Sequence, residues 1–244
     1  MSALVTATTD AAHPVLRSGE LGIAGLGWIA GGRFGAAYRG IEGSCQNFFL
    51  LRDELLERGI LRDPFRRFAK LDDACRSACL VAALALHDEG VDDGADGTHD
   101  VAVLGTSESG SLETNRAFYE DYVAHGRRSG RGSLFVYTLP SIPASEVSMH
   151  FKLVGPTTWI GSAESRGQVL LERACALLRR GESAAALCLD VSESGGVAVL
   201  LRREPRGRER LIDLAKTLRS ASSIATLAPL VDAVRHTLRE EREG

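Results

Sequence analysis

The sequence predicts an α/β domain in which a layered, mixed sheet carries helices on both faces. Short apolar runs alternate with longer segments of helical periodicity along most of the 244 residues, and this alternation is typical of layered folds with a mostly parallel sheet. Two apolar runs near residue 190 are joined by a link too short for a crossover helix. These two strands are therefore expected to pair antiparallel or to lie apart, which makes the sheet mixed.

The first half of the chain contains two predicted strands and two predicted helices. Apolar runs over residues 21–25 and 101–104 predict buried strands. Between them, apolar residues recur every three or four positions over 71–90, which predicts a helix that ends at a glycine. A second helix is expected over residues 112–123. The glycine-rich stretch 25–43 is interpreted as a loop.

The second half continues the alternation. Residues 144–151 are predicted to be helical, and the β-branched content of residues 157–160 predicts a strand. The segment 165–180 has an apolar stripe, two arginines at its end and a glycine after it, so it is predicted to be a helix. The two closely linked strands follow at residues 184–191 and 197–201.

We expect the chain to be organised in three parts. These are a flexible N-terminal segment over residues 1–19, one domain over 20–203 and a helical extension over 204–244. The extension is predicted to form two helices beyond Arg210. The second of these would carry its apolar residues on one face: Leu227, Leu230, Val231, Val234 and Leu238.

Composition and charge exclude several classes of function. Hydrophobic residues make up 44% and charged residues 25% of the chain, and the net charge is −3, so no overall positive field favours nucleic acid or anionic lipid. No apolar run approaches the roughly 20 residues that cross a bilayer, and residues 1–14 lack the pattern of a signal peptide. We therefore expect a cytoplasmic protein that contacts neither nucleic acid nor membrane.

The five cysteines are expected to be reduced, buried thiols. Their number is odd, and most lie in apolar surroundings. Cys75 and Cys79 are four residues apart, with no second pair and no histidine couple to complete a zinc site. No metal or other cofactor is expected.

The first candidate site is the segment 25–30, which matches G-x-G-x-x-A after a strand. Such spacing can present the N-terminus of a helix to a pyrophosphate. However, Gly31 and Gly32 follow it and disfavour a helix, and no strand ending in an acidic residue comes at the right distance. A dinucleotide-binding oxidoreductase is kept as an alternative function.

The second candidate site is the segment 155–182. Gly155-Pro156 is followed by six residues, Ala163-Glu164-Ser165, a helix and then Arg179-Arg180-Gly181-Glu182. This arrangement resembles the nucleophile region of β-ketoacyl synthases. In that family G-P is followed by six residues, A-C-S, a helix, and a basic pair with G-E.

Four further features resemble the same family and occur in its order. They are the opening strand with Gly25-Leu26-Gly27, the long helix over 68–90, the Gly105-Thr106 loop, and the segment from Leu139-Pro140-Ser141 to Phe151-Lys152-Leu153. The resemblance covers about residues 20–203. It implies that the chain adopts half of a thiolase-like ketosynthase fold.

The sequence departs from this family at the nucleophile. Glu164 occupies the position of the cysteine, whose thiol the family exposes at a strand-to-helix turn where the helix N-terminus lowers the thiol pKa. A glutamate cannot form the acyl thioester. Ketosynthases also have a second half that supplies two histidines and a lysine, which this sequence is expected to lack. No catalytic residue is therefore expected, and the chain is interpreted as a pseudoenzyme.

An enzymatic alternative remains open at Glu164. Family members with glutamine at this position decarboxylate malonyl groups, although they keep the histidines. A malonyl decarboxylase or an acyl transferase that uses Glu164 is therefore the second alternative function.

The resemblance also implies a partner. Ketosynthases dimerise through the strand before the nucleophile turn, and an inactive homologue, the chain-length factor, pairs with the active enzyme in polyketide, fatty-acid-like and aryl-polyene pathways. The resemblance implies a heterodimer with a ketosynthase subunit and indirect contact with an acyl carrier protein. A homodimer would use the same strand edge, so the sequence does not distinguish the two. The candidates for the interface and the acyl tunnel are Phe118, Tyr122, Phe135, Tyr137, Thr158 and Ile160.

Overall fold

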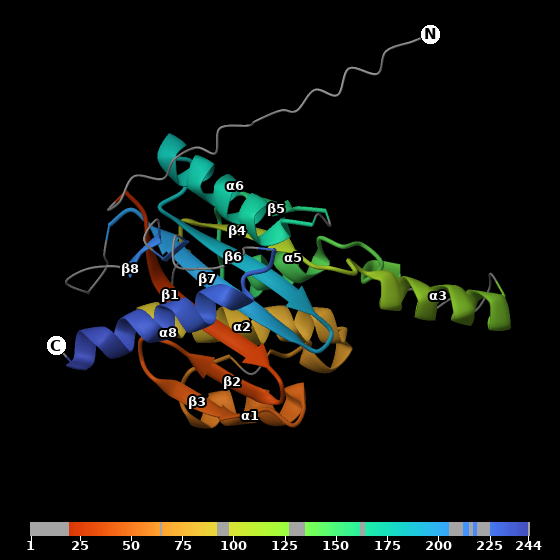
Figure 1. Ribbon diagram of the computed structural model, residues 1–244. Coiled ribbons are helices and arrows are strands. Elements are labelled where there is room, and N and C mark those ends of the chain that lie inside the picture. The colour runs from red at the N-terminus through yellow and green to blue at the C-terminus, as the bar shows by residue number, and fades with distance from the viewer. Residues whose placement is uncertain are drawn as a thin grey trace, which may run out of the picture.

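A computed structural model describes the chain from residue 20 to residue 243, with gaps (Figure 1). The described ranges are 20–63, 65–91, 98–126, 135–161, 164–204, 212–214, 217–218 and 225–243. The N-terminal segment 1–19 and much of the first helix predicted beyond Arg210 lie outside them. No helix in these ranges is long and apolar enough to cross a membrane.

One sheet of eight strands forms the centre of the molecule, in the order β3-β2-β1-β7-β6-β4-β5, with β8 pairing β1. The strands are β1 (Gly22–Ala30), β2 (Arg33–Ala36), β3 (Ile41–Ser44), β4 (Val101–Thr106), β5 (Thr157–Trp159), β6 (Ala185–Ser192), β7 (Gly195–Arg202) and β8 (Ile212–Asp213).

The predicted mixed sheet is confirmed, but the expectation that it is mostly parallel is wrong. Only β4 pairs in parallel, with β5 and with β6. Every other described strand pair is antiparallel, including the predicted hairpin of β6 and β7. Short turns join three of these antiparallel pairs, β1 with β2, β2 with β3 and β6 with β7, whereas the parallel pairs are separated in sequence by helices.

The glycine-rich stretch 25–43 is not the predicted loop. It continues β1 and then forms β2 and β3. A Cβ atom on Gly25 would lie 2.2 Å from the carbonyl oxygen of Ala85, so this glycine allows a helix backbone to approach the strand. The motif G-x-G-x-x-A therefore lies inside a strand and presents no helix N-terminus to a phosphate.

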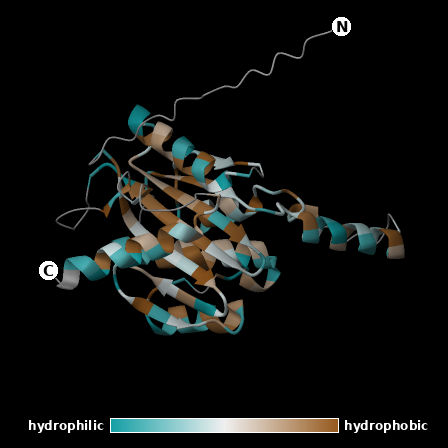
Figure 2. Ribbon diagram, in the orientation of Figure 1, coloured by the Kyte–Doolittle hydropathy of each residue, from teal (hydrophilic) through white to brown (hydrophobic). Residues whose placement is uncertain are grey.

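Helices cover both faces of the sheet. On one face, α1 (Phe48–Glu57), α2 (Asp73–Glu89) and α5 (Ile142–His150) pack with the sheet into one hydrophobic cluster. On the other face, α6 (Arg166–Arg180) and α8 (Ala228–Glu243) form a second cluster with the strands. Figure 2 shows the hydrophobic residues concentrated on the central strands.

The ends of the predicted helices follow from their capping residues. The carboxylate of Asp72 accepts a hydrogen bond from the backbone N–H of Cys75 at 2.9 Å and so begins α2. Gly90 ends α2 with a φ of 96°, and Gly181 ends α6 with a φ of 68°. Both glycines adopt the left-handed backbone conformation. It costs glycine little free energy, because glycine has no side chain.

Helix α3 (Leu112–His125) projects away from the sheet (Figure 1). The helix is found where the sequence predicts it, but none of its residues is buried. Its apolar side chains therefore lie on the surface, with Tyr119 at 67% and Val123 at 64% exposure. A helix with this much exposed apolar surface is typical of a region that contacts another molecule.

Candidate functional site

Glu164 lies at a strand-to-helix junction, as the sequence predicts. Strand β5 ends at Trp159 and α6 begins at Arg166, and Glu164 is an exposed residue in the turn between them. Ser162 and Ala163 lie outside the described residues. We call residues 164–169, which end this connection and form the first turn of α6, the elbow.

The Gly105-Thr106 motif holds the strand that leads into the elbow. The backbone N–H of Ile160 donates to the carbonyl of Gly105 at 2.8 Å, and the hydroxyl of Thr106 donates to the carbonyl of Ile160 at 3.1 Å. A Cβ atom on Gly105 would come within 2.6 Å of the ring of Trp159. The glycine therefore makes room for the indole, and the threonine fixes the end of β5.

A buried ion pair lies directly behind the elbow. The Nε atom of Arg166 donates to Oδ1 of Asp190 at 3.1 Å, and these side chains are only 14% and 9% exposed. A second Arg166 nitrogen lies 3.5 Å from a carboxylate oxygen of Glu108. The other Asp190 oxygen, Oδ2, accepts a hydrogen bond from the backbone N–H of Leu227 at 3.0 Å. Asp190 therefore connects β6 to the starts of both α6 and α8.

Neither Arg166 nor Asp190 is among the candidate residues predicted from the sequence. The available signal is an acidic residue inside the otherwise apolar run of β6. A carboxylate placed in a buried strand requires a buried partner.

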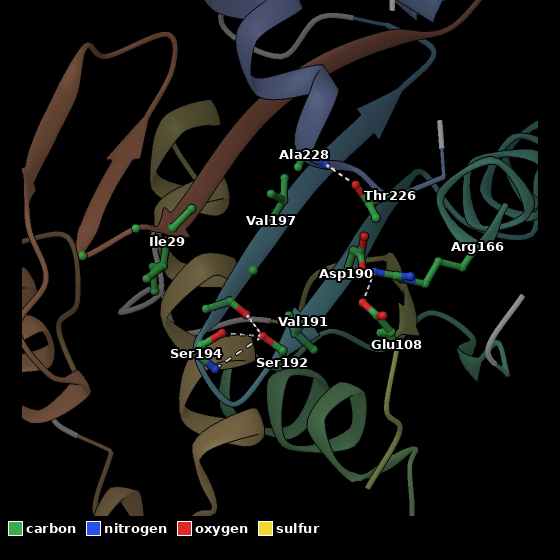
Figure 3. Close-up of a pocket in the computed structure, with 15 residues that line it drawn as sticks. Ile29, Glu108, Arg166, Asp190, Val191, Ser192, Ser194, Val197, Thr226 and Ala228 are labelled. Carbon is green, nitrogen blue, oxygen red and sulfur yellow. Dashed lines mark hydrogen bonds and ion pairs between the residues drawn. The ribbon is translucent and has the colours of Figure 1, made fainter. Parts of the chain in front are cut away.

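A cavity of about 480 Å³ opens beside the ion pair. Figure 3 shows Glu108, Arg166 and Asp190 on one side of it, with Ser192 and Ser194 of the hairpin on another. Thr226 and Ala228, at the start of α8, also line the cavity. Glu164 is not among the residues that line it, and neither is any histidine, cysteine or lysine.

The charged groups that line the cavity are paired with one another. The Arg166 guanidinium lies between the carboxylates of Asp190 and Glu108, and Ser192 donates its hydroxyl to the carbonyl of Gly195. No group of three or more potential metal ligands occurs in the described parts of the chain. At the elbow, the connection from β5 to α6 presents the exposed carboxylate of Glu164.

The family model for the N-terminal domain of β-ketoacyl synthases matches residues 10–206, which is most of the chain. The chain belongs to the β-ketoacyl synthase family. No curated protein sequence matched it.

Solved structures with this fold include other β-ketoacyl synthases. The structure of the ishigamide ketosynthase/chain length factor aligns with a TM-score of 0.55 and 14% identity, over 78% of this chain and 64% of that one. A β-ketoacyl synthase from Burkholderia phymatum aligns with a TM-score of 0.53 and 15% identity, over 76% of this chain and 59% of that one. This chain therefore spans less than two thirds of either.

In a third structure, the match extends over almost the whole length of the aligned chain. This structure is a ketosynthase in complex with its chain length factor from Xenorhabdus doucetiae, and the match has a TM-score of 0.54 and 15% identity. The match covers 88% of this chain and 92% of that chain, so the two chains are similar in length. The predicted class, half of a thiolase-like ketosynthase fold, is confirmed.

Two of the candidate interface residues of this β-ketoacyl synthase homologue lie together. The rings of Phe118, on α3, and Phe135 have centroids 5.7 Å apart. Tyr122, one helical turn beyond Phe118, is 41% exposed, and Phe135 is 58% exposed. These three aromatic residues therefore form an exposed surface that includes one side of the projecting helix.

The other three candidates have different surroundings. Tyr137 is partly buried against the first hydrophobic cluster, and burial, helped by the negative charge of Glu146, raises its pKa to about 12. Thr158 is exposed on β5, whereas Ile160 packs against the second cluster. Strand β5 is the last in the sheet and pairs only with β4 among the described strands.

Proposed function

We propose that this chain is a non-catalytic, chain-length-factor-like subunit that pairs with an active β-ketoacyl synthase. The observation that supports this proposal is Glu164 at the elbow, where the family carries the nucleophilic cysteine. A carboxylate cannot accept the acyl group as a thioester. The remaining function of such a subunit is to bind and shape a partner that holds the thiol.

The edge of the sheet supports the pairing. Among the described residues, β5 has one free edge, and the side chains of Thr157 and Thr158 on it are exposed. A free strand edge presents unpaired backbone N–H and C=O groups that another strand can satisfy. A partner with the same fold carries an equivalent edge strand, so we propose that the two sheets join through β5.

The projecting helix supports a role in shaping the partner. Its exposed aromatic residues, with Phe135 beside Phe118, are suited to form part of an acyl tunnel shared with a ketosynthase. We propose that these bulky side chains limit the length of the growing acyl chain in a polyketide or aryl-polyene pathway. The acyl carrier protein would then contact the complex through the active subunit.

Co-expression with candidate ketosynthases tests the pairing. The expected result is a stable complex that co-purifies through size exclusion, whereas this chain alone gives no condensation of acyl and malonyl groups. The variant Phe118→Ala should form the complex and lengthen the acyl products, because it removes a bulky side chain from the proposed tunnel. Failure to bind any ketosynthase that carries the cysteine would refute the proposal.

The same preparation distinguishes the enzymatic alternative. If Glu164 acts as a decarboxylase, the isolated chain should release carbon dioxide from malonyl carrier protein, and Glu164→Ala should abolish this release. We expect no release from either protein, because the two carboxylates that line the adjacent cavity, Glu108 and Asp190, are both paired with Arg166.

A further inference from the structure

The segment that begins α8 contacts the elbow directly. The backbone N–H of Gly167, in the first turn of α6, donates to the carbonyl of Ala225 at 3.0 Å. Two residues later, the N–H of Leu227 donates to Asp190. The backbone near the C-terminal end of the described chain thus satisfies one of the N–H groups at the start of α6 that have no partner within the helix.

The same segment is packed firmly onto the sheet. Leu227, Leu230 and Val234 are fully buried in the second hydrophobic cluster, together with strands β1, β6 and β7. Further along α8, the guanidinium of Arg235 lies 5.6 Å from the centre of the Trp28 ring and pairs with Glu42. Residues 225–238, which we call the strap, therefore run from the elbow across β1 toward β3 (Figure 1).

The strap covers the face of the sheet on which the elbow opens. It lies outside residues 10–206, which the family model matches, so the family domain does not account for it. Without the strap, the apolar residues of β1 and β7 that it buries would face water, at a cost of roughly 25 cal/mol for each Å² exposed. The strap also lines the cavity beside the elbow, through Thr226 and Ala228.

We propose that residues 225–238 form an internal strap that closes the Gly167 side of the elbow, leaves Glu164 exposed, and opens as a separate element, with Asp190 as its latch. Asp190 is suited to this role because one carboxylate oxygen binds Arg166 at the elbow and the other binds Leu227 in the strap. The carbonyl of Ala225 already accepts the hydrogen bond from the N–H of Gly167. A ligand that approaches the first turn of α6 therefore finds this N–H group occupied. When the strap is in place, the N–H of Gly167 is unavailable to a ligand, whichever residue occupies position 164.

Amide hydrogen exchange at single-residue resolution tests the strap. Asp190→Ala removes the latch, and Leu230→Ala removes packing from the strap at a buried position of α8. Each variant should speed exchange of the strap amides by at least about tenfold, because a buried hydrogen bond or a buried leucine contributes that much or more to closure. The N–H of Gly167 should be released together with the strap, even in Leu230→Ala, which leaves the elbow residues unchanged.

Glu20→Ala is the matched control. Glu20 forms a partly buried ion pair with Arg179 at the other end of α6, with an N–O distance of 2.7 Å. Its removal should leave strap exchange within about twofold of the unchanged protein, since it touches neither Asp190 nor the strap.

Two results would overturn the proposal. One is an exchange rate at Gly167 that stays unchanged while the strap amides speed up, because the elbow would then not be closed by the strap. The other is a strap that exchanges only together with the central amides of β4 and β6, because it would then open only through global unfolding. If the variants are too unstable to purify, exchange of the unchanged protein decides between separate and global opening.

Discussion

Gly27 permits α2 to cross β1 at close range. A Cβ atom at this position would lie 2.5 Å from the carbonyl oxygen of Val81 and 2.6 Å from the Cβ of Leu84. Because both atoms belong to a buried helix, the helix itself would have to shift. We expect Gly27→Ala to lower the free energy of unfolding by about 3 kcal/mol in urea denaturation.

Gly161→Ala is the control for this substitution. Apart from its chain neighbours, no described residue has an atom within 4 Å of a Cβ built on Gly161, so the Gly161→Ala variant should change the free energy of unfolding by less than about 0.5 kcal/mol. Equal urea midpoints for the two variants would contradict the close packing of α2 on β1.

His150 makes the stability of the protein depend on pH. Its ring stacks on Phe65 with centroids 3.3 Å apart, and burial lowers its pKa to about 4, although the charge of Asp63 opposes the shift. In the unfolded chain a histidine has a pKa of about 6.5. The unfolded state therefore binds the proton first, and stability falls as the pH drops from about 6.5 toward the folded pKa of about 4.

We expect His150→Phe to remove this part of the pH dependence. Between pH 7 and pH 5 the unchanged protein should lose about 2 kcal/mol more unfolding free energy than the variant. His236→Phe serves as the control, because His236 is 74% exposed on α8. An identical pH profile for the unchanged protein and His150→Phe would contradict the burial of His150.

Helix α3 contributes surface and little to the stability of the fold. Since none of its residues is buried, the double substitution Tyr119→Asp and Val123→Asp should change the free energy of unfolding by less than about 1 kcal/mol. It should nevertheless abolish co-purification with the proposed ketosynthase partner, because two charges would be buried in the proposed apolar contact. Calorimetry and size exclusion measure the two effects separately.

Leu50→Asp provides the comparison for α3. Leu50 is 52% exposed on α1, which contacts α2 and lies toward the β3 end of the sheet, away from β5. This charge should leave the complex intact. Equal loss of the partner with both variants would show that α3 is not the contact surface.

The elements that the sequence predicts correctly are those with local signals. Helix α6 has an apolar stripe, basic residues at its end and a glycine with positive φ, and all three act within the helix itself. The start of the stretch 25–43 lacks a local signal, because Gly25 and Gly27 are required by the close approach of α2, whose contacting residues lie more than fifty positions later in the chain. The glycines at 31 and 32 form the turn between two strands, both with positive φ.

The candidate site could be predicted only in part, for a related reason. The position of Glu164 follows from the spacing between a strand and a helix that are neighbours in sequence. Asp190 and the strap are brought to the elbow by tertiary contacts: Asp190 bonds to Arg166 and Leu227, which are 24 and 37 residues away. Such contacts leave no periodic pattern in the sequence.

At the scale of the whole molecule, the exposure of the five cysteine thiols reflects how tightly the two hydrophobic clusters are packed. Cys75, Cys79, Cys175 and Cys188 are buried, and Cys45 is partly exposed. Burial raises the pKa of each thiol, to about 12 for Cys175. We expect at most one of the five thiols to react rapidly with a disulfide reagent in the native protein and all five in denaturant. Rapid reaction of several thiols without denaturant would contradict the described core.

The pairing of β1 has a consequence for how the protein is made. Gly22 in β1 pairs with Arg202 in β7, and Ile23 pairs with Ile212 in β8. While the ribosome is still translating the intervening residues, one edge of β1 has no partner and the apolar face later covered by α8 is open to water. The nascent chain therefore carries an aggregation-prone surface through most of its synthesis, and chaperones that bind exposed strands would find it there.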